Sequence, residues 1–287
     1  MSYIEMSNPK VAENTMQKTW DELRNALSSG TLIADDIESA LDFTFLKVFN
    51  DIFVVHNEQR CCKRFLEEFE ERNQKFVRCA KVDQKWSPVY DRFIPKKEFI
   101  TEDNRFSPVG VEWLYLAWSD TINHAKECAK AECRIKTGDN MAFCEFTVAN
   151  KKAQIFDLTI ADHHTYDSIN QIIDKFVHNT AEKVVSIFLK TGELPSKSDL
   201  NDPTLEMSRL WAVFTYIRML SWQLFVPVND NKKYMYAPFH CFAYYLKSLG
   251  YDGIAYSSTV SSKGKNLVLF DKEFAKPVGV ITTEACE

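Results

Sequence analysis

The chain has 287 residues, of which 45% are hydrophobic and 13% aromatic, enough for one large domain with an extension. Its formal net charge of -5 argues against a general nucleic-acid binder, because such proteins are usually basic. The sequence lacks an apolar run of about 18 residues, so it predicts no membrane span. The stretch from Met1 to Ser29 is polar and unlike a signal peptide, so we expect a cytoplasmic protein.

The eight cysteines are irregularly spaced, with no Cys-x-x-Cys pair among them. In a chain of this size without an export signal, this pattern predicts reduced, buried thiols. Adjacent His163 and His164 would point in different directions in a strand or helix, and no third ligand lies at a useful spacing. We therefore predict no metal site.

Helical patterns occupy the N-terminal quarter. Residues 10–30 and 35–75 are predicted to be helical, separated by a short break, with Asp35 or Asp36 as the cap of the second segment. That segment carries a helical stripe of apolar side chains at Leu41, Phe45, Val48, Phe49 and Ile52, and it is expected to divide into two helices.

The middle of the chain has the pattern of strands. Strands are predicted at residues 75–82, 112–118, 141–148 and 154–160, where apolar and β-branched residues are frequent. Residues 83–104 are expected to form an ordered loop. Between the second and third strands, a helix capped by Ser119 or Asp120 should run to about Cys133.

The last part of the chain returns to helices and then to strands. Residues 166–225 are predicted to be helical with a loop at 192–203, and a helix at 239–249 should end at Gly250. Short strands are expected at 254–257 and 267–270. Strands and helices in this order indicate an α+β fold rather than regular βαβ alternation.

Three polar residues in the first half could carry chemistry. Arg105 follows Asn104 in a turn-prone stretch and could hold a phosphate, although a surface salt bridge is the ordinary alternative. Tyr115 alternates onto one strand face with Trp113 and Ala117, where it could stack on a flat ring or simply fill the core. Glu127 points away from the apolar stripe Ile122, Ala125, Ala129 and Cys133, toward a cleft or toward solvent and Lys130.

A second stretch could supply hydrogen bonds. Ser258 follows a short predicted strand, and Asn266 follows the glycine loop of residues 261–265. Both side chains could reach a pocket, but each could also be an ordinary loop residue.

Together these motifs resemble the RES domain family, which is named for its Arg, Glu and Ser. The resemblance rests on Asn-Arg-x-Ser-Pro-x-Gly-Val-x-x-Leu-Tyr-Leu-Ala at residues 104–117 with Glu127 on the next helix. It extends to the segments at 250–258 and 264–270, and Arg78 best matches an arginine that often opens the domain. It covers residues 75–275, beside a helical extension at 1–74.

The resemblance implies an ADP-ribosyltransferase-like fold, an α+β split β-sheet core with two small sheets around an NAD+ cleft. The domain would span residues 75–287, with a helical insertion at about 163–235. NAD+ would be a substrate cleaved at its nicotinamide–ribose bond by hydrolysis or phosphorolysis, with no other cofactor. Family members often act as toxins held by a cognate antitoxin, and a homodimer is also possible.

The resemblance also implies residue roles. Glu127 would stabilise the cationic ribose, and Arg105 and Arg78 would bind the pyrophosphate. Tyr115 would pack on the nicotinamide or its ribose. Hydrogen bonds to the substrate would come from Ser258, Asn266 and Tyr256. Two alternatives stay open: an ADP-ribosyltransferase that modifies a macromolecule, and a non-catalytic interaction protein that works through its helices.

Overall fold

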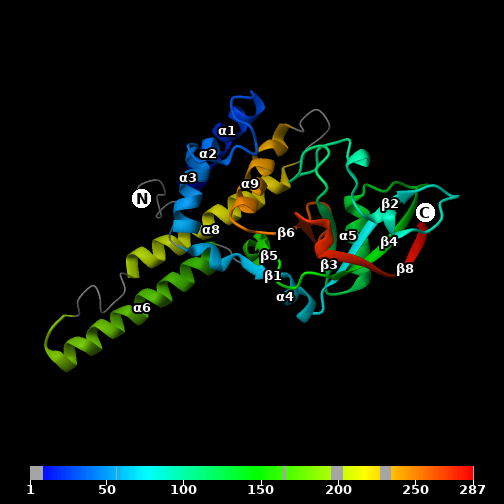
Figure 1. Cartoon of the computed structure of the whole chain (residues 1–287). Coiled ribbons are helices and arrows are strands. Elements are labelled where there is room, and N and C mark those ends of the chain that lie inside the picture. The colour runs from blue at the N-terminus through cyan, green and yellow to red at the C-terminus, as the bar shows by residue number, and fades with distance from the viewer. Residues whose placement is uncertain (1–8, 56, 164–165, 195–202, 227–233, 287) are drawn as a thin grey trace.

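The computed structural model describes residues 9–55, 57–163, 166–194, 203–226 and 234–286. Figure 1 shows a sheet on one side and a group of helices on the other, which confirms the predicted α+β class. The helices are α1 (Pro9–Ser28), α2 (Ile37–Ala40), α3 (Thr44–Asn50), α4 (Leu66–Glu71), α5 (Ile122–Glu132), α6 (Tyr166–Thr191), α8 (Pro203–Phe225) and α9 (Ala237–Ser248). The strands are β1 (Lys63–Phe65), β2 (Lys75–Val82), β3 (Leu114–Ser119), β4 (Asn140–Val148), β5 (Gln154–Asp157), β6 (Gly253–Ser257), β7 (Lys265–Leu269) and β8 (Ala275–Ala285).

The described strands are hydrogen-bonded into one sheet of eight, in the order β1-β5-β6-β7-β3-β2-β4-β8. Neighbouring strands are antiparallel except β5 and β6, which are parallel. The two separate small sheets that we expected are therefore not seen. The pairing of β3 with β7 joins the strands before and after the helical insertion into a continuous sheet.

Helix α5 and the helical group of α8 and α9 pack against the same face of the sheet. Strand β3 alternates as predicted: Leu114, Leu116 and Trp118 lie in one core, and Tyr115 and Ala117 face the other side. On that other side α5 packs against β2 and β3. The helical group, including α8 and α9, shares its core with the same face at β6 and β7. Between α5 and the start of α9, a cavity lies on this face over the central strands of the sheet.

The first 74 residues are mostly helical, but they share their core with the rest of the chain. Trp20 on α1 and Phe49 on α3 are almost fully buried in one cluster with Phe239, Phe242 and other residues of α9. Strand β1 comes from the same segment and pairs with β5 at the sheet edge. The boundary expected near residue 75 thus does not separate two hydrophobic cores.

Two local predictions were wrong and a third was confirmed. Thr121 caps α5, since its hydroxyl accepts a hydrogen bond from the His124 N–H at 3.2 Å, whereas Ser119 and Asp120 bond to each other. Strand β5 ends at Asp157, and a 3-10 turn continues over Leu158–His163. Gly250 does follow α9 in the left-handed conformation, with φ +86°, as predicted for a helix end.

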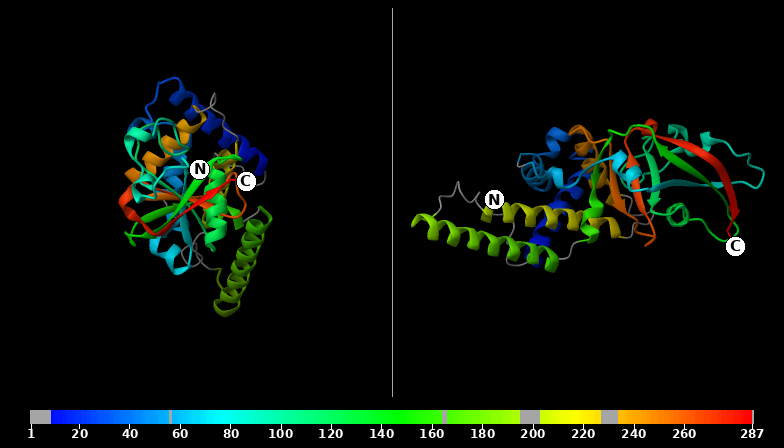
Figure 2. Two further views of the ribbon diagram at one scale, coloured as in Figure 1. Left: turned by 90° about the vertical axis from the view of Figure 1, so that its right-hand side faces the viewer. Right: turned by 90° about the horizontal axis from the view of Figure 1, so that it is seen from below.

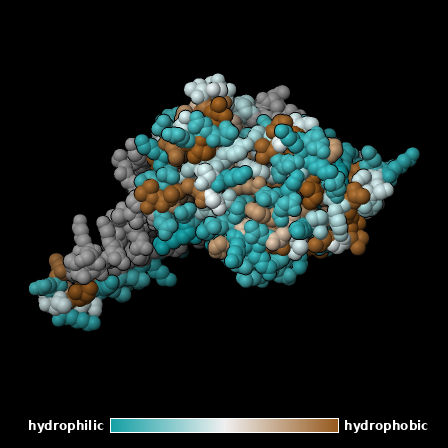
Figure 3. Space-filling view, in the orientation of Figure 1, coloured by the Kyte–Doolittle hydropathy of each residue, from teal (hydrophilic) through white to brown (hydrophobic). Residues whose placement is uncertain are grey.

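Helices α6 and α8 lie side by side and extend away from the sheet (Figure 2). Within the described residues, no helix has the length and apolar character needed to cross a membrane. Hydrophilic side chains predominate on the face shown in Figure 3. Near the far end of α6, Val185, Phe188 and Leu189 are exposed.

Candidate functional site

A cavity of about 430 Å³ opens between α5, the loop before β3 and the entry to α9. Its floor is made by β2, β3, β6 and β7. Five of the seven residues predicted for the site line it: Arg78, Arg105, Tyr115, Tyr256 and Asn266. Strands that are far apart in the sequence bring these residues together, because β3 is flanked by β2 and β7.

Three acidic residues line this cavity: Glu102, Asp103 and Glu132, of which Glu132 lies in the last turn of α5. The Ser258 hydroxyl donates to its Oε1 at 2.8 Å, and the Asn266 amide donates to the same oxygen at 2.5 Å. Both donor residues are at least 94% buried, whereas Glu132 remains open to the cavity. Ser258 also accepts hydrogen bonds from the N–H groups of Val260 and Ser261, which orients its own proton toward Glu132.

Glu127 is not in this cavity. It lies on the exposed face of α5, where its carboxylate pairs with Lys263 at 2.7 Å. The Lys263 hydrogen bond is the main reason that the pKa of Glu127 is lowered. The prediction that Glu127 shares a cleft with Arg105 is therefore wrong, and Glu132, five residues later, has the expected place.

Arg78 reaches the cavity from β2 with an unsatisfied group. Its Nη1 atom is buried and has no hydrogen-bond partner among the described residues. Burial lowers the pKa of Arg78 to about 10 from its usual value of 12.5. A buried guanidinium nitrogen without a partner favours an anionic ligand, because leaving such a donor unpaired is costly.

Arg105 enters from the opposite side. Its guanidinium donates to the Leu224 carbonyl on α8 and, at 3.4 Å, to the Thr259 hydroxyl. It also lies over the ring of Tyr236, 5.5 Å from the centroid. These contacts hold Arg105 at the cavity wall and connect it to the end of the helical insertion.

Aromatic side chains of Trp113, Tyr115, Tyr236 and Tyr256 line the cavity. The hydroxyls of the two predicted tyrosines, Tyr115 and Tyr256, stay protonated. Burial raises the pKa of both Tyr115 and Tyr256. The Tyr115 hydroxyl contacts the Ser107 hydroxyl at 3.0 Å and accepts from the Phe106 N–H at 3.3 Å. Tyr115 thus holds the loop that carries Arg105, in addition to lining the cavity.

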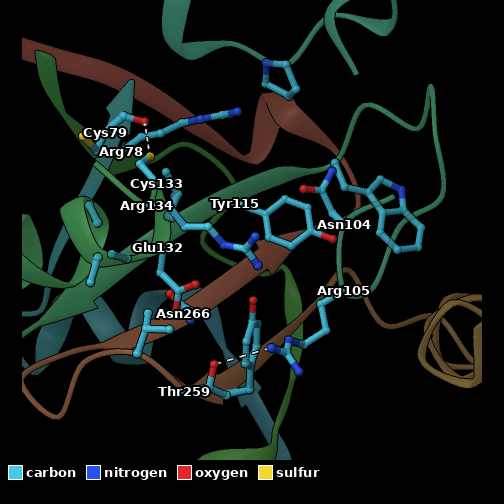
Figure 4. Close-up of a pocket in the computed structure, with 18 of the residues that line it drawn as sticks. Arg78, Cys79, Asn104, Arg105, Tyr115, Glu132, Cys133, Arg134, Thr259 and Asn266 are labelled. Carbon is cyan, nitrogen blue, oxygen red and sulfur yellow. Dashed lines mark hydrogen bonds between the residues drawn. The ribbon is translucent and has the colours of Figure 1, made fainter. Parts of the chain in front are cut away.

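Arg134 is a lining residue that sequence reasoning missed. It has a left-handed backbone with φ 50°, which is uncommon outside glycine, asparagine and aspartate. In Figure 4 its guanidinium points toward Tyr115, and Glu132 and Asn266 lie side by side. Three arginines from three elements therefore line one cavity: Arg78, Arg105 and Arg134.

The chain was compared with protein-family models, curated proteins and solved structures. None of them matches it.

Helical position could have identified Glu132. The buried residues of α5 are Ala125, Cys128 and Ala129. Glu132 lies four residues after Cys128 and three after Ala129, so it continues the row that faces the sheet. A carboxylate on a sheet-facing row at a helix end is a stronger candidate than one on the opposite face.

The glycine loop brings Ser258 and Asn266 to the helix. A Cβ atom on Gly264 would lie 2.6 Å from the Cβ atom of Cys128, so only glycine allows the loop to approach α5 this closely. Strand β7 then starts at Lys265 and directs Asn266 toward Glu132. This close approach explains why a glycine stands two residues before Asn266.

The arrangement combines cationic and anionic parts in one small cavity. Its volume is typical of small-molecule sites. The arginines can bind phosphate groups, the tyrosine rings can pack on flat rings, and Glu132 can stabilise positive charge that develops nearby. Across the described residues there is no cluster of three or more His, Cys, Asp or Glu side chains placed to hold a metal ion.

Proposed function

We propose that this cavity binds NAD+ and cleaves the bond between nicotinamide and ribose. The observation that carries the proposal is the Glu132 carboxylate, fixed through one oxygen by Ser258 and Asn266 and flanked by cavity-lining arginines. The proposal includes the ADP-ribosyltransferase-like fold implied by the resemblance to the RES family. The chain would act as a toxin, with a cognate antitoxin as its partner.

The charges of the cavity fit the charges of this substrate. The diphosphate of NAD+ would pair with Arg78 and Arg105, and the otherwise unpaired Nη1 of Arg78 would gain an acceptor. Arg134 adds a third cation to the lining of the same cavity. The tyrosine rings would pack on the nicotinamide or its ribose.

Cleavage would use the carboxylate electrostatically. As the C–N bond breaks, positive charge spreads over the ribose ring and nicotinamide leaves as a neutral molecule. Glu132 would stabilise that charge with its Oε2, which has no hydrogen-bond partner among the described residues, whereas Oε1 is held by two donors. Water would then give ADP-ribose and a proton, whereas phosphate would give ADP-ribose phosphate.

Two glutamates on one helix provide a matched test. Wild type, Glu132→Gln and Glu127→Gln are incubated with NAD+, with and without phosphate, and the products are identified by mass. We expect Glu132→Gln to lose about 100-fold or more in turnover, as is typical when a preorganised electrostatic group is removed. Glu127→Gln should stay within about threefold of wild type, because its partner Lys263 lies outside the cavity.

The same assay can contradict the proposal. Wild-type protein that leaves NAD+ intact with water, phosphate and cell extract would count against NAD+ cleavage. If only Glu127→Gln lost turnover, the catalytic carboxylate would be Glu127 and not Glu132. Thermal unfolding of each variant separates loss of activity from loss of fold.

A neighbouring hollow favours a second candidate, transfer of ADP-ribose to a macromolecule. A cavity of about 630 Å³ lies beyond the loop of Ser258, and Thr259 and Val260 line both this cavity and the first one. An acceptor side chain could enter from there. Tagged NAD+ added to cell extract distinguishes the two: label on macromolecules means transfer, and free labelled ADP-ribose means hydrolysis.

A further inference from the structure

Two cysteines meet at the edge of the cavity. No disulfide joins any of the eight cysteines, which all lie within the described residues, but contrary to expectation not all are buried, and Cys133 is exposed. The Cys133 thiol donates to the Cys79 carbonyl at 3.0 Å, so the end of α5 lies directly against β2 at this point. Figure 4 shows the Cys133 thiol beside the Cys79 carbonyl, close to Arg78.

We propose that Cys79 and Cys133 form a reversible disulfide when hydrogen peroxide, or another hydroperoxide, enters the cavity. Disulfide formation requires two thiols whose backbones already lie close together. Here β2 supplies one thiol, the end of α5 supplies the other, and these two elements pack against each other. Disulfides that form in reducing compartments are usually transient, and they are catalytic or redox-sensing.

The surroundings distinguish the roles of the two sulfurs. Cys133 is accessible, and its pKa is lowered, first by the hydrogen bond from Cys79 and then by the nearby positive charge of Arg78. The pKa of Cys79 is raised by the same hydrogen bond and by burial. Cys133 is therefore the sulfur that reacts first, because the thiolate is the nucleophile.

The chemistry balances with peroxide as the oxidant. The Cys133 thiolate attacks one peroxide oxygen, the O–O bond breaks, and hydroxide leaves and takes up a proton to become water. The product is a sulfenic acid on Cys133. The Cys79 sulfur then attacks the Cys133 sulfur, the S–O bond breaks, and the departing hydroxide leaves as water with the Cys79 proton. Two thiols are oxidised and one peroxide is reduced to two water molecules.

The bond would tie together the two elements that carry the cavity's main charges. Cys79 directly follows Arg78, and Cys133 lies between Glu132 and Arg134. A disulfide would link the β2 strand to the end of α5 at this point and couple the cavity to the oxidation state of its surroundings. The inference does not depend on which ligand the cavity takes.

A peptide mass tests the proposal directly. The full-length protein is treated with hydrogen peroxide, its free thiols are blocked, and it is digested with trypsin. Cleavage after Arg78, Lys81, Lys130 and Arg134 should release residues 79–81 joined to residues 131–134. We expect this species in about half of the molecules or more at sub-millimolar peroxide, and its loss after treatment with dithiothreitol.

Three variants complete the experiment. Cys79→Ser should leave a sulfenic acid on Cys133 that dimedone traps, and Cys133→Ser should give neither the trapped acid at residue 79 nor the linked peptide. Cys61→Ser, a partly exposed control, should behave as wild type. The proposal would be overturned if, after peroxide treatment, Cys79 and Cys133 were both still free thiols that react with the blocking reagent. A disulfide between Cys133 and Cys286 would overturn it as well. NAD+ cleavage is not a readout here, so either proposal can fail alone.

Discussion

At the scale of single residues, Arg78 places ligand binding in conflict with stability. Burial lowers the pKa of this guanidinium from 12.5 to about 10, a cost of roughly 3 kcal/mol if the charge is kept at neutral pH. One of its nitrogens is buried without a partner in the described part of the chain. Such a cost is typical of functional sites, where a side chain that destabilises the fold is kept because it binds a ligand.

We therefore expect Arg78→Met to separate the two properties. The variant should keep or raise the midpoint of thermal unfolding, because an apolar side chain of similar length avoids the buried charge. Its affinity for NAD+ should fall at least about tenfold, because a charge-assisted hydrogen bond is lost. Calorimetric titration in a Glu132→Gln background measures binding without turnover.

Arg92→Met is the matched control for this experiment, because Arg92 is exposed and donates to the Lys81 carbonyl at 3.0 Å. It should leave NAD+ affinity nearly unchanged. A loss of more than about 2 kcal/mol in unfolding free energy for Arg78→Met, with binding intact, would show that Arg78 has a structural role instead.

The same scale shows why one site residue was misplaced. The expected stripe on the helix included Cys133 and omitted Cys128, which rotated the assumed buried face. The structure buries Cys128 and leaves Cys133 exposed, so Glu132 and not Glu127 reaches the cavity. An error of this size is inherent to a short helix with several small residues, since alanine and cysteine occur on either face.

At the scale of elements, strands with a clear alternation of apolar residues were predicted correctly, whereas a strand that depends on its pairing partner was not. Strands β2, β3 and β4 have the expected bounds within about two residues, because alternation over several residues is unambiguous. The three-residue β1 has no such pattern and exists only through its pairing with β5. Arg134 was likewise hidden, since its place depends on the left-handed turn after α5.

Helix α9 holds the arginine loop through a buried histidine. His240 is 6% exposed, and its Nε2 lies 2.8 Å from the Asn104 carbonyl, next to Arg105. Burial lowers the pKa of His240 below its usual 6.5. As pH falls below 6.5, the unfolded chain binds a proton at this residue more readily than the folded chain, so stability decreases.

His240→Gln should therefore lessen the loss of stability between pH 7 and pH 5, because its amide can still donate to Asn104 but does not titrate. Urea unfolding at several pH values measures the difference in slope between wild type and variant. His124→Gln, at an exposed position on α5, is the control and should keep the wild-type slope. Equal slopes for wild type and His240→Gln would contradict the assignment.

At the scale of the whole molecule, aromatic rings connect the N-terminal helices to the cavity. Trp20 on α1 packs edge-on against Phe239 on α9, with ring centroids 5.0 Å apart. Phe239 in turn contacts Phe106, and Phe106 contacts Tyr256, at 5.5 and 5.0 Å. The residue before Phe106 is Arg105, so a continuous packed path joins α1 to the cavity wall.

This path makes the first 74 residues part of one cooperative unit, and Trp20→Ala tests that claim. Trp20 is 1% exposed, so its truncation should cost about 3–5 kcal/mol. The loss should appear in a single transition that fluorescence, circular dichroism and the reactivity of Cys133 toward a thiol reagent report alike. Trp222→Ala, at a position 43% exposed, should cost about 1 kcal/mol or less. If α1 unfolded in a separate early transition while Cys133 kept its wild-type reactivity, the N-terminal helices would be an appended unit, and the cavity would not depend on them.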